Sequence, residues 1–194
     1  MDGGSERRGA ARRAPARAAR GAAEEIDALW RAGAPAAHRR ALGQVLTPPD
    51  LAALMAGWIA PARPARVLDP ALGTGVLARA MAAAVPGVAV TGWEIDPAIA
   101  EAARAACALE GVALDLRLGD FLDAKPEGYD AVIGNPPWLR PRAGNGLRAR
   151  IRAMAEATGL PLAGPLNAYA LFVIAACGQL RPGGRAACLL PAEW

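Results

Sequence analysis

The sequence contains very few of the side chains that serve as nucleophiles, general bases or zinc ligands. Its 194 residues include one histidine, His38, and one serine, Ser5, which argues against a hydrolase built on a Ser-His-Asp triad. Three scattered cysteines, Cys107, Cys177 and Cys188, form no Cys-x-x-Cys pair, and with a single histidine they do not make a zinc site. Any chemistry must therefore come from carboxylates, amides, the backbone or a bound cofactor, and we expect no metal.

Long hydrophobic segments and a signal peptide are also missing. The longest apolar run, residues 168–177, is too short to span a bilayer. An odd number of cysteines without a signal peptide indicates reduced thiols. Because 54% of the residues are hydrophobic in a chain of 19.9 kDa, one folded domain with a substantial core is expected. We therefore expect a soluble, cytoplasmic protein without a membrane partner.

The excess positive charge lies in the N-terminal segment. Residues 1–20 hold six arginines against Asp2 and Glu6, which accounts for the whole net charge of +4. The only lysine is Lys125, and together with the abundance of Ala, Gly and Pro this suggests a GC-rich coding bias. Residues 1–22 are expected to form a disordered tail; contact with nucleic acid and a plain terminus both stay open.

A helical region, residues 23–62, is expected after the tail. Ile26, Leu29 and Trp30 share one face of a first helix that ends near Gly33. Thr47 is predicted to be the N-cap of a second helix, with prolines in its first turn.

From residue 63 to residue 194, short apolar runs alternate with helical segments. The expected strands cover residues 66–69, 88–94, 114–118, 131–133 and 185–190. The expected helices cover residues 74–84, 97–110 and 167–180, with Pro182-Gly183-Gly184 closing the last one. This alternation predicts an α/β domain with a doubly wound, mostly parallel sheet and helices on both faces.

Candidate ligand-binding residues follow three of these strands, where open α/β sheets bind ligands. The first strand leads into a glycine-containing turn, residues 69–75, whose backbone can approach a ligand closely. Such a turn alone is equally typical of an ordinary strand-to-helix connection. The second strand ends at Glu94, where an acid can bind ribose hydroxyls; the third is followed by Asp120, which can accept from an adenine amino group. Ala78 in the place of a third glycine does not exclude NAD.

The fourth strand is followed by Asn135-Pro136-Pro137-Trp138, the most specific motif of the chain. Two prolines fix a turn and direct carbonyl groups outward. The oxygens of Asn135 and Pro136 can accept both hydrogens of a planar amino group, which draws the nitrogen lone pair out of conjugation and towards an electrophilic methyl group. The face of Trp138 can stack on the substrate and stabilise the developing cation. The alternative is a rigid turn whose Trp138 packs in the core.

On these residues the sequence resembles S-adenosylmethionine-dependent amino-methyltransferases, and within them the adenine-specific DNA methyltransferases of restriction-modification systems. The resemblance implies the Rossmann-like class I methyltransferase fold, and its motifs lie at residues 43–49, 69–75, 94, 120–121, 135–138, 169–172 and 180–184.

The resemblance also implies roles for individual residues. The methionine part of the cofactor would be held by Thr47, Asp69, Pro70, Ala71, Gly73 and Gly75. Glu94 would bind the ribose, and Asp120 the adenine amino group, with Ile95 and Phe121 lining that pocket. The catalytic turn, which would hold the flipped target adenine, comprises Asn135, Pro136, Pro137 and Trp138, where Trp138 replaces the commoner tyrosine or phenylalanine.

A basic segment follows the catalytic turn. No acidic residue lies between positions 131 and 155, but five arginines do: Arg140, Arg142, Arg148, Arg150 and Arg152. We expect them to contact the DNA backbone and so to offset the cost of extruding a base. The alternative is a solvated loop and helix face.

The sequence ends just after the fifth strand, whereas the family continues with further strands and a target-recognition domain. We therefore expect an incomplete catalytic domain, with its last strands missing, that depends on a missing recognition domain or specificity subunit. Three alternatives stay open: a release-factor type protein-glutamine methyltransferase, an RNA amino-methyltransferase and a non-catalytic truncated remnant. The first is disfavoured because an acidic, glycine-rich segment does not follow the catalytic turn.

Overall fold

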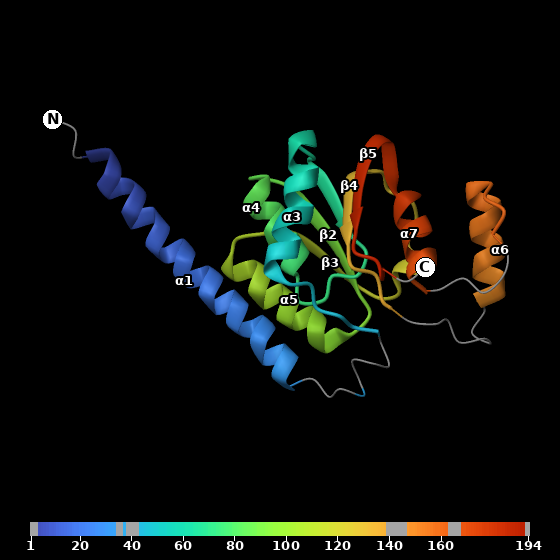
Figure 1. Cartoon of the computed structure of the whole chain (residues 1–194), viewed down its shortest axis with the longest axis horizontal. Helices are drawn as coiled ribbons and strands as arrows, with labels where there is room; N and C mark the ends of the chain where they lie inside the picture. Colours follow the sequence, from blue (N-terminus) through green and yellow to red (C-terminus); the bar gives the residue numbers. More distant parts are fainter. Residues whose placement is uncertain (1–3, 34–36, 38–42, 139–146, 163–167, 193–194) are drawn as a thin grey trace.

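A parallel sheet of five strands, in the order β3-β2-β1-β4-β5, forms the centre of the structure, a computed structural model that describes residues 4–33, 37, 43–138, 147–162 and 168–192 (Figure 1). Its strands are β1 (Arg66–Asp69), β2 (Ala89–Glu94), β3 (Ala113–Leu118), β4 (Tyr129–Gly134) and β5 (Leu180–Cys188). Since β1 pairs with both β2 and β4, the strand order reverses at β1. The carboxyl ends of β1 and β4 therefore flank the crevice in which such sheets bind ligands.

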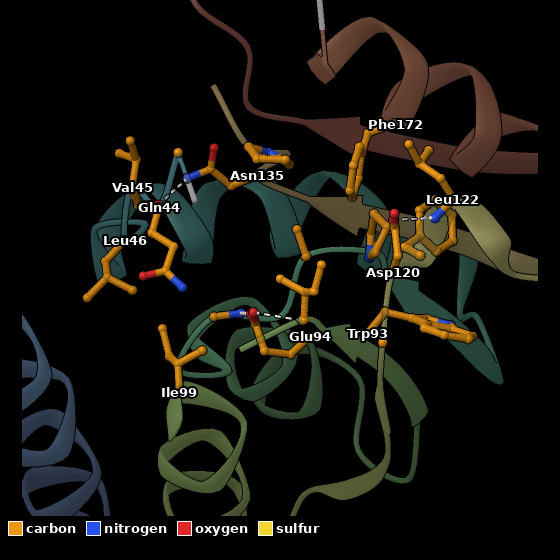
Figure 2. A pocket seen from close by; sticks show the side chains of 18 residues that line it. Gln44, Val45, Leu46, Trp93, Glu94, Ile99, Asp120, Leu122, Asn135 and Phe172 are labelled. Carbon is orange, nitrogen blue, oxygen red and sulfur yellow. Dashed lines mark hydrogen bonds between the residues drawn. The ribbon is translucent and has the colours of Figure 1, made fainter. Parts of the chain in front are cut away.

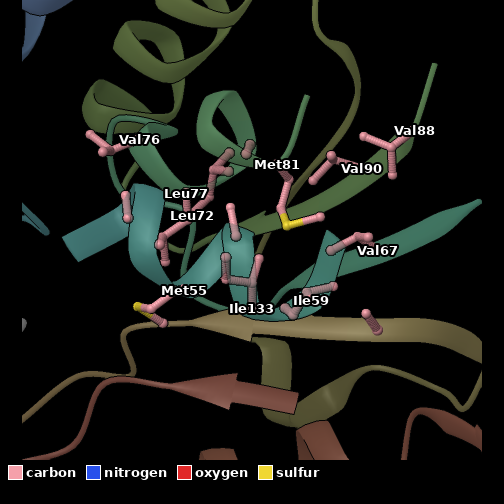
Figure 3. Packing of buried hydrophobic residues seen from close by; sticks show 14 of the residues in the cluster. Met55, Ile59, Val67, Leu72, Val76, Leu77, Met81, Val88, Val90 and Ile133 are labelled. Carbon is pink, nitrogen blue, oxygen red and sulfur yellow. The ribbon is translucent and has the colours of Figure 1, made fainter. Parts of the chain in front are cut away.

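Helices cover both faces of the sheet, as the sequence predicts. The covering helices are α3 (Pro49–Ile59), α4 (Val76–Ala84), α5 (Pro97–Leu109) and α7 (Ala168–Cys177), with short 3-10 turns η1 (Ala60–Ala62) and η2 (Phe121–Asp123). A further helix, α6 (Leu147–Thr158), contacts α7. Side chains alternate between faces along a strand. Val67 and Ile133 accordingly pack against α3 and α4 (Figure 3), whereas Leu68 and Val132 belong to the cluster on the α7 side.

The first helix, α1 (Gly4–Gly33), differs from the expectation in its length and in the exposure of Leu29. Residues 4–22, expected to be a disordered tail, are helical, in keeping with the high helix propensity of alanine and arginine. Leu29 is 65% exposed, whereas Ile26 and Trp30 are half-buried on the face that also buries Ala23 and Asp27. The small Ala23 allows close approach to the domain, and the carboxylate of Asp27 forms a buried ion pair with Arg79 of α4.

Two further boundaries differ for identifiable reasons. Helix α3 has no side-chain cap because Pro48, which has no side-chain acceptor, occupies its N-cap position; Thr47, the predicted N-cap, lies one residue earlier and interacts with Asn135. Strand β5 begins at Leu180 and includes the Pro182-Gly183-Gly184 segment that was expected to end a helix. Proline is tolerated there because β5 is at the edge of the described sheet. The pairing of β4 with β5 is also irregular at this point, with a register shift between Tyr129 and Ala131 of β4.

Candidate active site

A cavity opens at the carboxyl ends of the strands. Figure 2 shows Asn135 and the adjoining Val45 at one end, Asp120 and Phe172 at the other, and Glu94 between them. Of the residues singled out in the sequence, those on its wall are Pro70, Ala71, Gly73, Glu94, Ile95, Asp120, Phe121, Asn135 and Pro137. The topology therefore brings together residues that are distant in the sequence: Pro70 and Pro137, for example, are 67 positions apart.

The turn after β1 depends on its glycines. Gly73 and Gly75 have φ angles of +55° and +79°, which L side chains rarely adopt. At Gly75 a Cβ atom would also come within 2.8 Å of the Cys107 sulfur. Gly75 caps α4, so the free N–H groups of that helix start at this turn.

Glu94 holds the same turn in place. One carboxylate oxygen accepts from the N–H of Gly73 at 2.9 Å, and the other accepts from Ile95 and Asp96, each at 2.9 Å. Burial raises the pKa of Glu94, and these backbone hydrogen bonds oppose that rise. The carboxylate is thus fixed in orientation on the cavity wall, and one of its four acceptor sites, on the oxygen that accepts from Gly73, is left by these hydrogen bonds.

Asp69 is fully buried at the end of β1 and does not border the cavity. Its Oδ1 accepts from the N–H of Ala71 at 3.2 Å, whereas Oδ2 has no hydrogen-bond partner among the described residues. Burial, with a smaller contribution from Glu94, raises the pKa of Asp69 to about 7. Asp69 therefore stabilises the turn after β1 through its hydrogen bond to Ala71, without bordering the cavity.

The opposite end of the cavity combines a carboxylate with aromatic rings. Asp120 Oδ1 accepts from the N–H of Leu122 at 3.0 Å and thereby caps η2. The ring of Phe121 lies edge-on to Trp93, with centroids 6.3 Å apart, and 5.6 Å from the ring of Phe172. An acceptor beside an apolar wall is the environment that an adenine base with its amino group requires.

At the other end, the amide of Asn135 has a defined orientation. Its nitrogen donates to the carbonyl oxygen of Val45 at 2.8 Å and to the hydroxyl of Thr47 at 3.2 Å. Because a carbonyl can only accept, the nitrogen must face Val45. The buried Oδ1 is left without a hydrogen-bond partner among the residues that the structure describes.

The catalytic turn continues along the same N-terminal segment. The N–H of Trp138 donates to the carbonyl oxygen of Gly43 at 3.3 Å. The Trp138 side chain is 40% exposed, so it does not pack in the core.

Comparison with known proteins identifies the family. Residues 51–158 match the family described as "Methyltransferase small domain", which is more than half of the chain. The chain belongs to this methyltransferase family. A Type II methyltransferase of Thermus thermophilus, M.TthHB8I, is 34% identical over 168 residues, which cover 82% of this chain and 37% of that protein. A release factor glutamine methyltransferase of Cereibacter sphaeroides is 38% identical over 125 residues, covering 62% of this chain and 45% of the relative.

A solved structure supports the fold. The methyltransferase subunit of a type I restriction-modification system from Streptococcus thermophilus superimposes with a TM-score of 0.64 at 23% identity, over 77% of this chain and 36% of that one. The class I methyltransferase fold predicted from the sequence is thus confirmed. The methyltransferase chain spans less than half the length of each of these relatives.

S-adenosylmethionine is the cofactor of this methyltransferase family, and the cavity has the chemistry to hold it. Glu94, Asp120 and Phe121 line it, and with the cofactor bound the two carboxylates would provide acceptors for ribose and adenine and Phe121 an apolar wall. The described part of the chain gathers no group of three or more potential metal-ligating side chains. Among the helices described, none is long and apolar enough to cross a membrane.

The arginines of the basic segment fall into different environments. Arg140 and Arg142 lie outside the described residues, and for Arg148 only the helical backbone is described. Arg152 is exposed on α6. Arg150 departs from the expectation of phosphate contact, because its guanidinium pairs with Asp120 and Asp123.

Several residues on the cavity wall were given no role from the sequence, although Gln44 and Val45 lie in one of its motifs. Gln44, Val45 and Trp93 line the cavity, and Gln44 also donates to Asp96 at 3.3 Å. Thr47 was expected on the cofactor, but it does not border the cavity and instead supports Asn135. Only the proximity of residues 43–47 to the catalytic turn, which is a tertiary contact, reveals these roles.

Proposed function

We propose that this methyltransferase acts on the exocyclic amino group of adenine in DNA, in the manner of a restriction-modification enzyme. The observation that carries the proposal is the orientation of Asn135, a residue of the cavity wall whose Oδ1 is buried and has no hydrogen-bond partner among the described residues. An amide oxygen held in this way is an acceptor available for an amino hydrogen, and the carbonyl of Pro136 supplies the second acceptor. The 34% identity to a Type II methyltransferase supports DNA as the substrate.

In the proposed reaction Asn135 and Pro136 orient the amine and Trp138 stacks on the base. When bound, S-adenosylmethionine would supply an electrophilic methyl group: the nitrogen–carbon bond would form as the sulfur–carbon bond breaks, with S-adenosylhomocysteine as the leaving group and the amine's proton passing to solvent. Two preorganised acceptors stabilise the positive charge that develops on the nitrogen. We propose Arg140, Arg142, Arg148 and Arg152 as contacts to DNA phosphates, and a recognition domain or specificity subunit as the source of sequence selectivity.

The second candidate function is methylation of a glutamine amide, which presents the same planar amino group. The 38% identity to a release factor glutamine methyltransferase favours it, although over fewer residues of this chain. RNA adenine is a third acceptor with the same chemistry.

Tritium transfer from labelled S-adenosylmethionine to double-stranded DNA, to transfer RNA and to a release factor separates these functions. We expect label in DNA and, after digestion, in N6-methyladenine. Label in protein or RNA alone assigns the enzyme to the corresponding alternative. Asn135→Ala is expected to abolish incorporation into whichever acceptor is used.

A further inference from the structure

Arg150 of α6 bridges two carboxylates at the adenine end of the cavity. Its Nη1 lies 2.6 Å from Oδ2 of Asp120, and its Nη2 lies 2.9 Å from Oδ1 of Asp123. Asp120 lines the cavity, whereas Asp123 does not. The bridge therefore connects a helix that follows the catalytic turn to a residue of the proposed cofactor site.

We propose that Arg150 is a positioning residue for recognition of the cofactor's adenine: it fixes the carboxylate of Asp120 and docks α6 beside it. This inference rests on the proposed role of Asp120. It differs from the phosphate-binding role expected of Arg150 from the sequence, because in the structure the guanidinium is already engaged by two carboxylates.

The geometry explains how the bridge acts. Asp120 Oδ1 is held by the N–H of Leu122 and Oδ2 by Arg150, so both oxygens are fixed and rotation of the carboxylate is prevented. Each oxygen keeps a lone pair that can accept from a 6-amino group. A fixed carboxylate accepts well from an amino group and repels a carbonyl oxygen at the same position. Loss of Arg150 should therefore weaken the choice between these two groups.

The two ends of the bridge are unequal. Asp123 is well exposed and contributes only a second anchor for the guanidinium, while Asp120 is partly buried. Exposed ion pairs contribute little, so the expected effect is modest. Arg152, exposed on the same helix, provides a matched control of equal charge.

The test compares two ligands without any acceptor substrate. The full chain is titrated calorimetrically with S-adenosylhomocysteine and with S-inosylhomocysteine, in which a carbonyl replaces the 6-amino group. Wild type should prefer S-adenosylhomocysteine. Arg150→Ala should weaken its binding about three- to fivefold and leave S-inosylhomocysteine unchanged, so that discrimination falls by the same factor.

Companion variants define the mechanism. Arg150→Lys should restore part of the preference, because an ammonium contacts one carboxylate without the bidentate geometry. Asp123→Asn should give a smaller loss, and Arg152→Ala none. Circular dichroism verifies that each variant is folded.

Other outcomes overturn the inference. If Arg150→Ala weakens the binding of both ligands equally, the bridge has only a structural role. If the binding of both ligands is unchanged, the bridge is a surface ion pair without a role in cofactor recognition. Tighter binding of S-adenosylhomocysteine means that Arg150 competes with the cofactor. If the wild-type chain does not bind S-adenosylhomocysteine, or does not prefer it to S-inosylhomocysteine, then Asp120 does not recognise the adenine amino group and the inference is wrong. Since no DNA is present, failure of the proposed acceptor leaves this result untouched.

Discussion

The amide nitrogen of Asn135 lies 3.2 Å from the hydroxyl of Thr47, although the two residues are 88 positions apart in the chain. The contact connects the catalytic turn after β4 to the segment that precedes α3. Together with the carbonyl of Val45 it uses both amide hydrogens and leaves the amide oxygen for a substrate.

Removing the Thr47 hydroxyl should therefore slow methyl transfer. Thr47→Val deletes one hydrogen bond to Asn135, worth about 1 kcal/mol, so we expect kcat to fall about fivefold. Thr47→Ser keeps the hydroxyl and should retain most activity. Steady-state tritium transfer with varied S-adenosylmethionine measures both parameters. If Thr47→Val raises the KM for S-adenosylmethionine and leaves kcat unchanged, Thr47 binds the cofactor, as the family resemblance of the sequence implies.

Asp69 should make stability depend on pH. Its pKa rises from 3.8 to about 7 on burial, so between these values the folded state binds a proton that the unfolded state has lost. The free energy of unfolding should consequently decrease by up to about 4 kcal/mol as pH rises from 4 to 7. Asp69→Asn removes this contribution. Urea unfolding of both proteins at pH 5 and pH 8 tests it, and equal pH dependence of the two would contradict it.

The buried ion pair between Asp27 and Arg79 should be strongly coupled to stability. Asp27→Ala leaves the guanidinium without its partner from α1, and we expect a loss of about 3–5 kcal/mol. The matched control is Glu24→Ala on the same helix, which breaks an exposed pair with Arg20 and should cost less than about 0.5 kcal/mol. Denaturant unfolding compares them. Similar values for the two variants would show that α1 does not depend on this contact.

Leu72 and Gly92 should behave as a pair. A Cβ atom at Gly92 would come within 2.7 Å of a methyl group of Leu72, which is buried. We expect Gly92→Ala to destabilise by about 1–3 kcal/mol through overpacking. Leu72→Ala leaves a cavity, and the double variant should be more stable than the sum of the single losses predicts. If the losses of unfolding free energy in the two single variants simply add in the double variant, the contact with Leu72 is not the reason that position 92 requires glycine.

The proposed contact of the basic segment with DNA can be tested through Arg140 and Arg142, which lie outside the described residues. Arg140→Glu combined with Arg142→Glu should weaken DNA binding and reduce the steepness of its salt dependence, because fewer counterions are released. Fluorescence anisotropy at several salt concentrations measures both quantities. Unchanged affinity and slope would assign these arginines to a solvated surface.

The sequence predicts the sheet and the carboxyl ends of its strands well, because short apolar runs and glycine turns are local signals. Glu94 ends a strand, and Asp120 and Asn135 each follow one, so the parallel topology alone brings them to one cavity. The roles of Thr47 and Arg150 depend on which distant groups meet their side chains, and local patterns carry no such information. The same holds for α1: its apolar pattern places Ile26 and Trp30 on the side facing the domain, but it does not reveal that Asp27 is buried there in an ion pair.

The pairing of Asp27 with Arg79 also limits how far this protein can be shortened. The family match begins at residue 51, and a version trimmed to that boundary would lose all of α1. Among the described residues, the guanidinium of Arg79 would then keep Glu110 alone as a counter-ion, and the surface of α5 now covered by α1 would face water. Recombinant versions meant for crystallisation should therefore keep the part of the first helix that carries Asp27, even though it lies far from the proposed methyl-transfer chemistry.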